Sequence, residues 1–145
     1  MRKALTPDTL PAPFARYSHG VEISSPARWV WCSGQLGMDE DGQIPEDALA
    51  QAKLCFENAA KILSAANIGM NDVVRVNAYV TDRSFMAPYM EARDMFFDSP
   101  PPASTLMIVG GFTRPEFKVE VEIVAAQEVP SWRIKQTVVF GGKNL

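Results

Sequence analysis

Residues 117–123 read Phe-Lys-Val-Glu-Val-Glu-Ile, which is the most regular alternation in the chain. The apolar side chains all fall on one face of an extended segment, and Lys118, Glu120 and Glu122 fall on the other. Because successive side chains of a β-strand point to opposite faces, this pattern predicts a strand with one buried and one polar face. The segment before it with the same period is residues 74–81, whose polar face carries Arg75, Asn77, Tyr79 and Thr81.

Two other segments change to helical spacing. The first opens at Pro45-Glu46-Asp47, where proline and acidic residues suit the first turn of a helix. It closes at Asn67-Ile68-Gly69, a typical C-cap sequence. The second starts near Asp82 or Ser84, both good N-caps, and ends before the proline run at 100–102.

Together these patterns predict one α+β domain with the order β-β-α-β-α-β-β, an antiparallel or mixed sheet and both helices on one face. Residues 1–20 are expected to form an extended arm, residues 1–129 the domain, and residues 130–145 a tail without an assigned structure. Strands at 21–24 and 28–33 are expected to form a hairpin, and residues 37–42 a loop. The remaining expected strands lie at 74–81, 104–109 and 117–123.

The sheet has an unusually apolar second face. Trp29 to Trp31 and the run Leu106 to Val109 are apolar on both alternating sides, although two helices cover only one face. Self-association is the simplest way to bury the other face. The alternative is coverage by the tail, through Trp132, Val138, Val139 and Phe140.

Composition excludes several classes of protein. The 145 residues carry a net charge of −3 and no basic run, which argues against nucleic acid as a partner. No segment approaches the roughly 20 apolar residues of a membrane span, and the N-terminus lacks the apolar core of a signal peptide. We therefore expect a cytoplasmic protein in which Cys32 and Cys55 are reduced core residues. His19 is the only histidine, so we expect no metal site.

Six short motifs resemble landmarks of the RidA (YjgF) family, and their order and spacing make the match specific. They are Ala15-Arg16-Tyr17-Ser18-His19-Gly20, Cys32-Ser33-Gly34-Gln35, Glu57-Asn58, Asp72-Val73-Val74-Arg75-Val76, Pro102-Ala103-Ser104 and Lys118-Val119-Glu120-Val121-Glu122. The resemblance covers about residues 13 to 126. It implies a chorismate-mutase-like fold, a homotrimer whose sheets form a barrel, and small-molecule pockets at the subunit interfaces.

The resemblance also implies an activity, which is hydrolysis of 2-imino or enamino acids to 2-keto acids and ammonia without a cofactor. An arginine after the second helix binds the substrate carboxylate in that family, and here Ser104 stands in its place. A hydroxyl cannot neutralise a carboxylate as a guanidinium does. Met90 stands where the family has an asparagine, and the segment up to Pro115 is about two residues longer. The chain thus looks like a divergent member.

The resemblance makes Glu120 and Tyr17 the candidate catalytic residues. Glu120 would position the attacking water as a general base, or it belongs to a solvated strand face with Lys118 as its partner. Tyr17 would hydrogen-bond the ligand or the leaving amine, or it would only hold the N-terminal arm on the sheet. Nearby His19 is either a proton donor or a surface residue of the arm.

The candidate substrate-binding residues are Ser33, Ser104, Thr105 and Arg114. Ser33 matches a pocket serine at a strand end, but it also suits a turn before Gly34. Ser104 and Thr105 would bind a smaller or uncharged substrate, or they simply begin a strand. Arg114, in the lengthened loop, would supply the missing positive charge, or it is an ordinary solvated arginine.

Two functions of different classes remain. The first is a cofactor-free hydrolase of a small imine, enamine or related nitrogenous metabolite. Because Ser104 replaces the arginine that binds the carboxylate in the family, its substrate need not be a standard 2-imino acid. The second is a non-catalytic trimer that binds a small metabolite or modulates a partner enzyme. The family's older label, endoribonuclease, is a third interpretation, which the acidic composition opposes.

Overall fold

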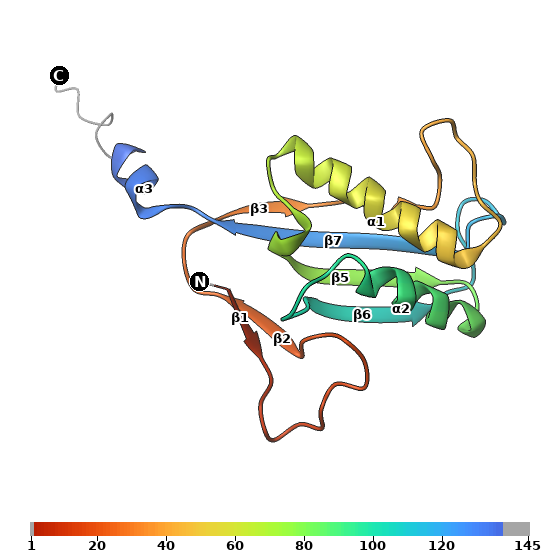
Figure 1. The fold of residues 1–145 in the computed structure, drawn as a ribbon, viewed down its shortest axis with the longest axis horizontal. Coiled ribbons are helices and arrows are strands. Elements are labelled where there is room, and N and C mark those ends of the chain that lie inside the picture. The colour runs from red at the N-terminus through yellow and green to blue at the C-terminus, as the bar shows by residue number, and fades with distance from the viewer. Residues whose placement is uncertain (1, 138–145) are drawn as a thin grey trace.

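The computed structural model describes residues 2–137 and shows a mixed sheet with the strand order β3-β7-β5-β6 (Figure 1). The strands are β3 (Ala27–Trp31), β7 (Val119–Glu128), β5 (Val73–Val80) and β6 (Ala103–Ile108), and the short β4 (Gln35–Leu36) also pairs with β7. Strands β5 and β6 run parallel, whereas the other pairs are antiparallel. The expected α+β class is confirmed.

Helices α1 (Ala48–Ala65) and α2 (Met86–Asp94) lie on the same face of this sheet, as predicted (Figure 1). The Asp47 carboxylate caps α1 by accepting from Ala50 N at 3.0 Å, and the left-handed Asn67 follows its end. A one-turn 3₁₀ helix (Met70–Asp72) leads into β5, and another (Arg83–Phe85), capped by Asp82, leads into α2.

The core lies between the helices and the sheet. Phe56 of α1 is fully buried and stacks on Tyr89 and Phe96, with ring centroids 6.0 and 5.2 Å apart. The same cluster contains alternate residues of both central strands, which are Val76, Ala78 and Val80 of β5 and Val119, Val121 and Ile123 of β7. Cys32 and Cys55 are free thiols in this core, as expected.

Gln51 connects α1 to the loop before β7. Its side chain is fully buried, and its amide nitrogen donates to Pro45 O at 2.8 Å and to Glu116 O at 2.9 Å. Its amide oxygen accepts from Lys118 N at 2.8 Å. These three bonds fix the position at which β7 begins, one residue before Glu120.

The predicted hairpin of residues 21–24 and 28–33 is wrong. Strand β2 (Gly20–Ile23) pairs with β1 (Arg2–Leu5), a strand that the sequence patterns did not indicate, while β3 pairs with β7. Pro26 lies between β2 and β3 and has no N–H to donate, and its carbonyl accepts from Val129 N beyond the end of β7. Arg2 holds β1 in place by donating to Asn71 O and Pro100 O.

Strand β7 is longer than predicted and continues to Glu128, because Val124 to Glu128 pair with β3. After it, residues Ser131–Thr137 form a short helix, α3, which projects beyond the sheet (Figure 1). The other predicted strands begin and end within a few residues of the observed ones.

The second face of the sheet is open in the single chain. Trp29 and Trp31 stack there with ring centroids 5.7 Å apart, and they are 44% and 69% exposed. Trp132 of the tail is itself 59% exposed, and Val138, Val139 and Phe140 lie outside the described residues. We refer to this surface, formed by the outward side chains of β3, β7, β5 and β6, as the open face.

Candidate active site

Polar side chains of β5 and β7 meet in the middle of the open face. Strand register places Asn77 beside Glu122 and Tyr79 beside Glu120. Glu122 Oε1 accepts from Tyr79 Oη at 2.9 Å and from Asn77 Nδ2 at 3.2 Å. These residues alternate with fully buried apolar neighbours. Because side chains of a strand alternate between its two faces, the polar side chains point to the open face.

A cavity of about 340 Å³ lies at one end of this polar row. Its lining residues are Tyr79, Val109, Gly111, Phe112, Glu120 and Glu122. Carboxylates and one phenol therefore converge on a space with apolar walls, which is the usual composition of a small-molecule site. This volume is large enough for a ligand of a few carbon atoms.

The two acids of the cavity are placed differently. Burial raises the pKa of Glu120, and the neighbouring charge of Glu122 raises it further. Glu122 has two hydrogen-bond donors, and its bond to Tyr79 raises the pKa of that phenol. Glu120 accepts no hydrogen bond from the described residues, which suits a group that accepts and releases a proton.

The turn after β3 lies directly against Glu120. A β-carbon on Gly34 would meet Glu120 Oε1 at 1.9 Å, so only glycine leaves room for this carboxylate. Ser33, the preceding residue, is exposed, and Gln35 Nε2 donates to its carbonyl oxygen at 3.0 Å. The structure therefore brings the candidates Ser33 and Glu120 to the same end of the sheet.

Ser104 and Thr105 point to opposite faces of β6. Thr105 pairs with Asn77 and lies on the open face, whereas Ser104 pairs with the buried Val76 and lies on the helix side. Tyr89 of α2 is its neighbour there, and burial raises the pKa of that tyrosine to about 12 against the opposing effects of Arg93 and Ser104. Within the chain, Ser104 and Glu120 do not face a common space.

Tyr17 lies at the other end of the sheet from Glu120. Its neighbour Ser18 bridges to Ala103 at the start of β6, whereas Glu120 lies level with Met107 through Tyr79. At 3.3 Å per residue, these two rows are about 13 Å apart along the strands. The Tyr17 ring contacts Phe14 and His19, with centroids 6.4 and 5.8 Å away, and His19 bonds to Pro11 O.

Arg114 lies in a depression next to the cavity. That depression, of about 380 Å³, shares Gly111 and Phe112 with it. The Arg114 side chain is exposed, forms an ion pair with Glu116 at 3.2 Å and lies over the Phe117 ring at 5.8 Å. The positive charge of Arg114 is therefore partly neutralised by Glu116 of the same loop.

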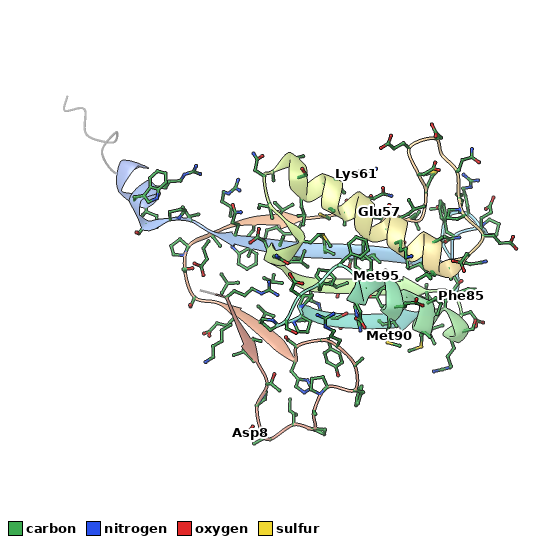
Figure 2. All side chains as sticks on the ribbon, in the orientation of Figure 1. Asp8, Glu57, Lys61, Phe85, Met90 and Met95 are labelled. Atoms are coloured by element: carbon green, nitrogen blue, oxygen red, sulfur yellow. The ribbon has the colours of Figure 1, made fainter. Side chains whose placement is uncertain are left out.

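Met90 lies in the helix layer, on α2, as Figure 2 shows together with Glu57 and Lys61 of α1. It packs against the core and not against the cavity. Among residues 2–137, no cluster of three or more histidine, cysteine or acidic side chains is arranged to hold a metal ion. No helix in the same range is long and apolar enough to cross a bilayer.

Much of the polar row is formed by residues that are not among the candidates predicted from the sequence, namely Arg75, Asn77 and Tyr79. The signal was present, because the alternation of residues 74–81 already put them on one face. What the alternation does not give is the pairing that sets this face beside Glu120 and Glu122. Two strands with polar outer faces in one small domain are a sign that a polar site lies between them.

Comparisons with known proteins agree with this architecture. A family model described as Endoribonuclease L-PSP matches residues 8–127. The 2-iminobutanoate/2-iminopropanoate deaminase of Salmonella typhimurium is 29% identical over 131 residues, which are 88% of this chain and 99% of that protein.

Solved structures show the same relationship. YyfB of Yersinia pestis, titled a protein of unknown function of the conserved Rid family, gives a TM-score of 0.77 at 26% identity over 87% of this chain and 98% of that one. The structure of Escherichia coli TdcF with bound serine gives a TM-score of 0.65 at 28% identity, over 87% of this chain and 99% of that one. The chain therefore belongs to the RidA/YjgF family, described by its model as Endoribonuclease L-PSP.

Proposed function

We propose that this protein is a cofactor-free hydrolase that converts small imines or enamines to carbonyl compounds and ammonia. The observation that carries the proposal is the cavity on the open face, in which Glu120 has a raised pKa beside Glu122 and Tyr79. The deaminase name of the Salmonella typhimurium relative supports the reaction class. The serine in the TdcF structure supports a ligand of amino acid size.

The reaction needs only water and proton transfers. Glu120 accepts a proton from water while the oxygen attacks the carbon of the C=N bond, which gives a tetrahedral carbinolamine. The same proton then goes to the nitrogen, and Glu120 next takes the hydroxyl proton of the carbinolamine and passes it to the nitrogen as well. The C–N bond breaks, and ammonia leaves as the C=O bond forms. A carboxyl group of raised pKa suits both steps, because it must hold the proton between them.

We propose that the working site is completed by a second copy in a homotrimer. Tyr17 lies about 13 Å along the strands from the row of Glu120 in one chain. The exposed, stacked pair Trp29 and Trp31 also needs cover on the same face. Packing open faces of several copies together satisfies both needs and encloses the cavity.

The test is release of ammonia from 2-iminobutanoate generated in the assay by an amino acid oxidase, for wild type, Glu120→Gln and Ser104→Arg. We expect activity in the wild type and a loss of at least about 100-fold in Glu120→Gln. If only Ser104→Arg is active, the fold is competent but the natural ligand is not a 2-imino acid. Wild-type activity that Glu120→Gln retains in full contradicts the mechanism.

A second candidate function is a binding module without catalysis, favoured by one observation, the position of Ser104 on the helix side of β6. Thermal stabilisation by small amines, amides or keto acids without turnover would support it. RNA cleavage is disfavoured, because Glu120 and Glu122 line the cavity and repel a phosphate backbone.

A further inference from the structure

Arg75 has an unusual set of partners on the open face. Its Nε donates to Asn77 Oδ1 at 2.8 Å, and its Nη2 donates to Thr105 Oγ1 at 2.6 Å. Both acceptors are neutral, and no carboxylate among residues 2–137 forms an ion pair with this guanidinium. A half-buried arginine without a counter-charge is uncommon, because burial is costly for an unpaired charge.

The two bonds hold the guanidinium in a defined orientation. An arginine has five N–H groups, and these contacts occupy two of them. The remaining three, including both on Nη1, have no hydrogen-bond partner in the described part of the chain. Planar N–H pairs of this kind match the two oxygens of a carboxylate.

The hydrogen bonds continue from Arg75 towards the cavity. Because arginine only donates, its bond fixes Asn77 Oδ1 as the acceptor, and Asn77 Nδ2 therefore faces Glu122. Glu122 Oε1 also accepts from Tyr79 Oη, which lines the cavity with Glu120. One connected row therefore runs from the Arg75 guanidinium to the Glu122 carboxylate, and the Asn77 amide lies between them.

We infer that Arg75 binds the carboxylate of the substrate, in the role for which Ser104 is unsuited. The inference rests on the proposed function, since it takes the ligand to be a 2-imino or 2-keto acid. The guanidinium holds the carboxylate group through its free N–H pair, and the C=N carbon then extends towards the cavity of Glu120. Thr105 and Asn77 act as positioning residues that orient the guanidinium.

The test is isothermal titration calorimetry with 2-oxobutanoate, the stable product of 2-iminobutanoate hydrolysis, and with butanone, which has a methyl group in place of the carboxylate. We expect wild type to bind 2-oxobutanoate, Arg75→Gln to bind it at least about 30-fold more weakly, and Arg75→Lys to fall between them. Binding of butanone should be equally weak in all three. Arg28→Gln is the matched control, because Arg28 also donates only to neutral acceptors, Ala66 O and Gln127 Oε1.

The outcomes separate this inference from the proposed function. If binding depends on Arg75 but no imine is turned over, the inference stands and the hydrolase function fails. If imino acids are turned over while Arg75→Gln keeps its KM and Kd within twofold of wild type, the inference is overturned and the function stands. Absence of 2-oxobutanoate binding by wild type overturns the inference too. Thermal unfolding of each variant shows whether it is folded.

Discussion

The carboxylate of Glu120 occupies the space that a side chain on Gly34 would fill. A β-carbon at position 34 would lie 1.9 Å from Glu120 Oε1 and 2.8 Å from Glu120 Cδ. Gly34 belongs to the turn between β3 and β4, both of which pair with the strand that carries Glu120. The turn therefore lies directly against Glu120, and its glycine leaves the space that the carboxylate occupies.

Gly34→Ala is expected to abolish most of the activity with little loss of stability. The added methyl group displaces the Glu120 carboxylate, which is the mobile end of a side chain, and leaves the core unchanged. Gly69→Ala is the matched control, because a β-carbon there meets nothing within 4 Å. Steady-state assays and thermal unfolding of both variants check this, and full activity in Gly34→Ala would argue against Glu120 as the base.

The pH dependence of the reaction should report the raised pKa of Glu120. The base is active as the carboxylate, so activity falls as the pH drops through this pKa, above the ordinary glutamate value of about 4.3. Glu122→Gln removes a neighbouring negative charge, so the acidic limb of kcat/KM should move to lower pH. A limb that does not move would mean that another group titrates.

The same shift predicts an effect on stability. Since the folded-state pKa of Glu120 is raised, its stabilising contribution is present at low pH and is lost as the pH rises through that pKa. Glu120→Gln should therefore raise Tm at pH 7, and the gain should vanish below about pH 4. Glu116, whose pKa is lowered by its own backbone N–H and by Arg114, is a control of opposite sign. Glu116→Gln should lower Tm at pH 7 and lose this effect in acid.

Gln51→Leu should destabilise the fold by about 3 kcal/mol, because it leaves two carbonyls and one N–H without their partner. The affected groups are Pro45 O, Glu116 O and Lys118 N, next to the start of β7. Urea unfolding measures the change. Gln43→Leu, at an exposed site, should stay within about 0.5 kcal/mol of wild type, and equal effects would contradict the role of the buried amide.

Local patterns were sufficient to predict most elements of the fold. The alternation of residues 117–123 and the cap residue Asp47 act within a few residues, so the sequence shows them directly. The partner of β2 could not be predicted in this way. It depends on Arg2, which reaches Asn71 and Pro100, residues distant in sequence.

The residues of the candidate site also differ in whether a local sequence pattern or a long-range contact reveals them. Glu120 and Ser33 were found from motifs, and the structure puts them near each other. In the sequence Arg75 is only one polar residue of an alternating strand, because its significance comes from its bonds to Asn77 on the same strand and to Thr105 across the parallel pair of β5 and β6. Which face Ser104 takes also depends on β6 register, which no local pattern sets.

An active site that combines residues of two copies can be rebuilt by mixing two variants, each of which lacks one of the residues and is expected to have lost most of its activity. Tyr17→Phe and Glu120→Gln are each prepared, unfolded together in equal amounts and refolded, and ammonia release from 2-iminobutanoate is measured. A site that takes Tyr17 from one copy and Glu120 from another is intact in roughly one quarter of random combinations. We expect recovery towards one quarter of wild-type activity. An absence of recovery in mixed trimers shown to have formed would mean that Tyr17 and Glu120 of different copies do not share a site.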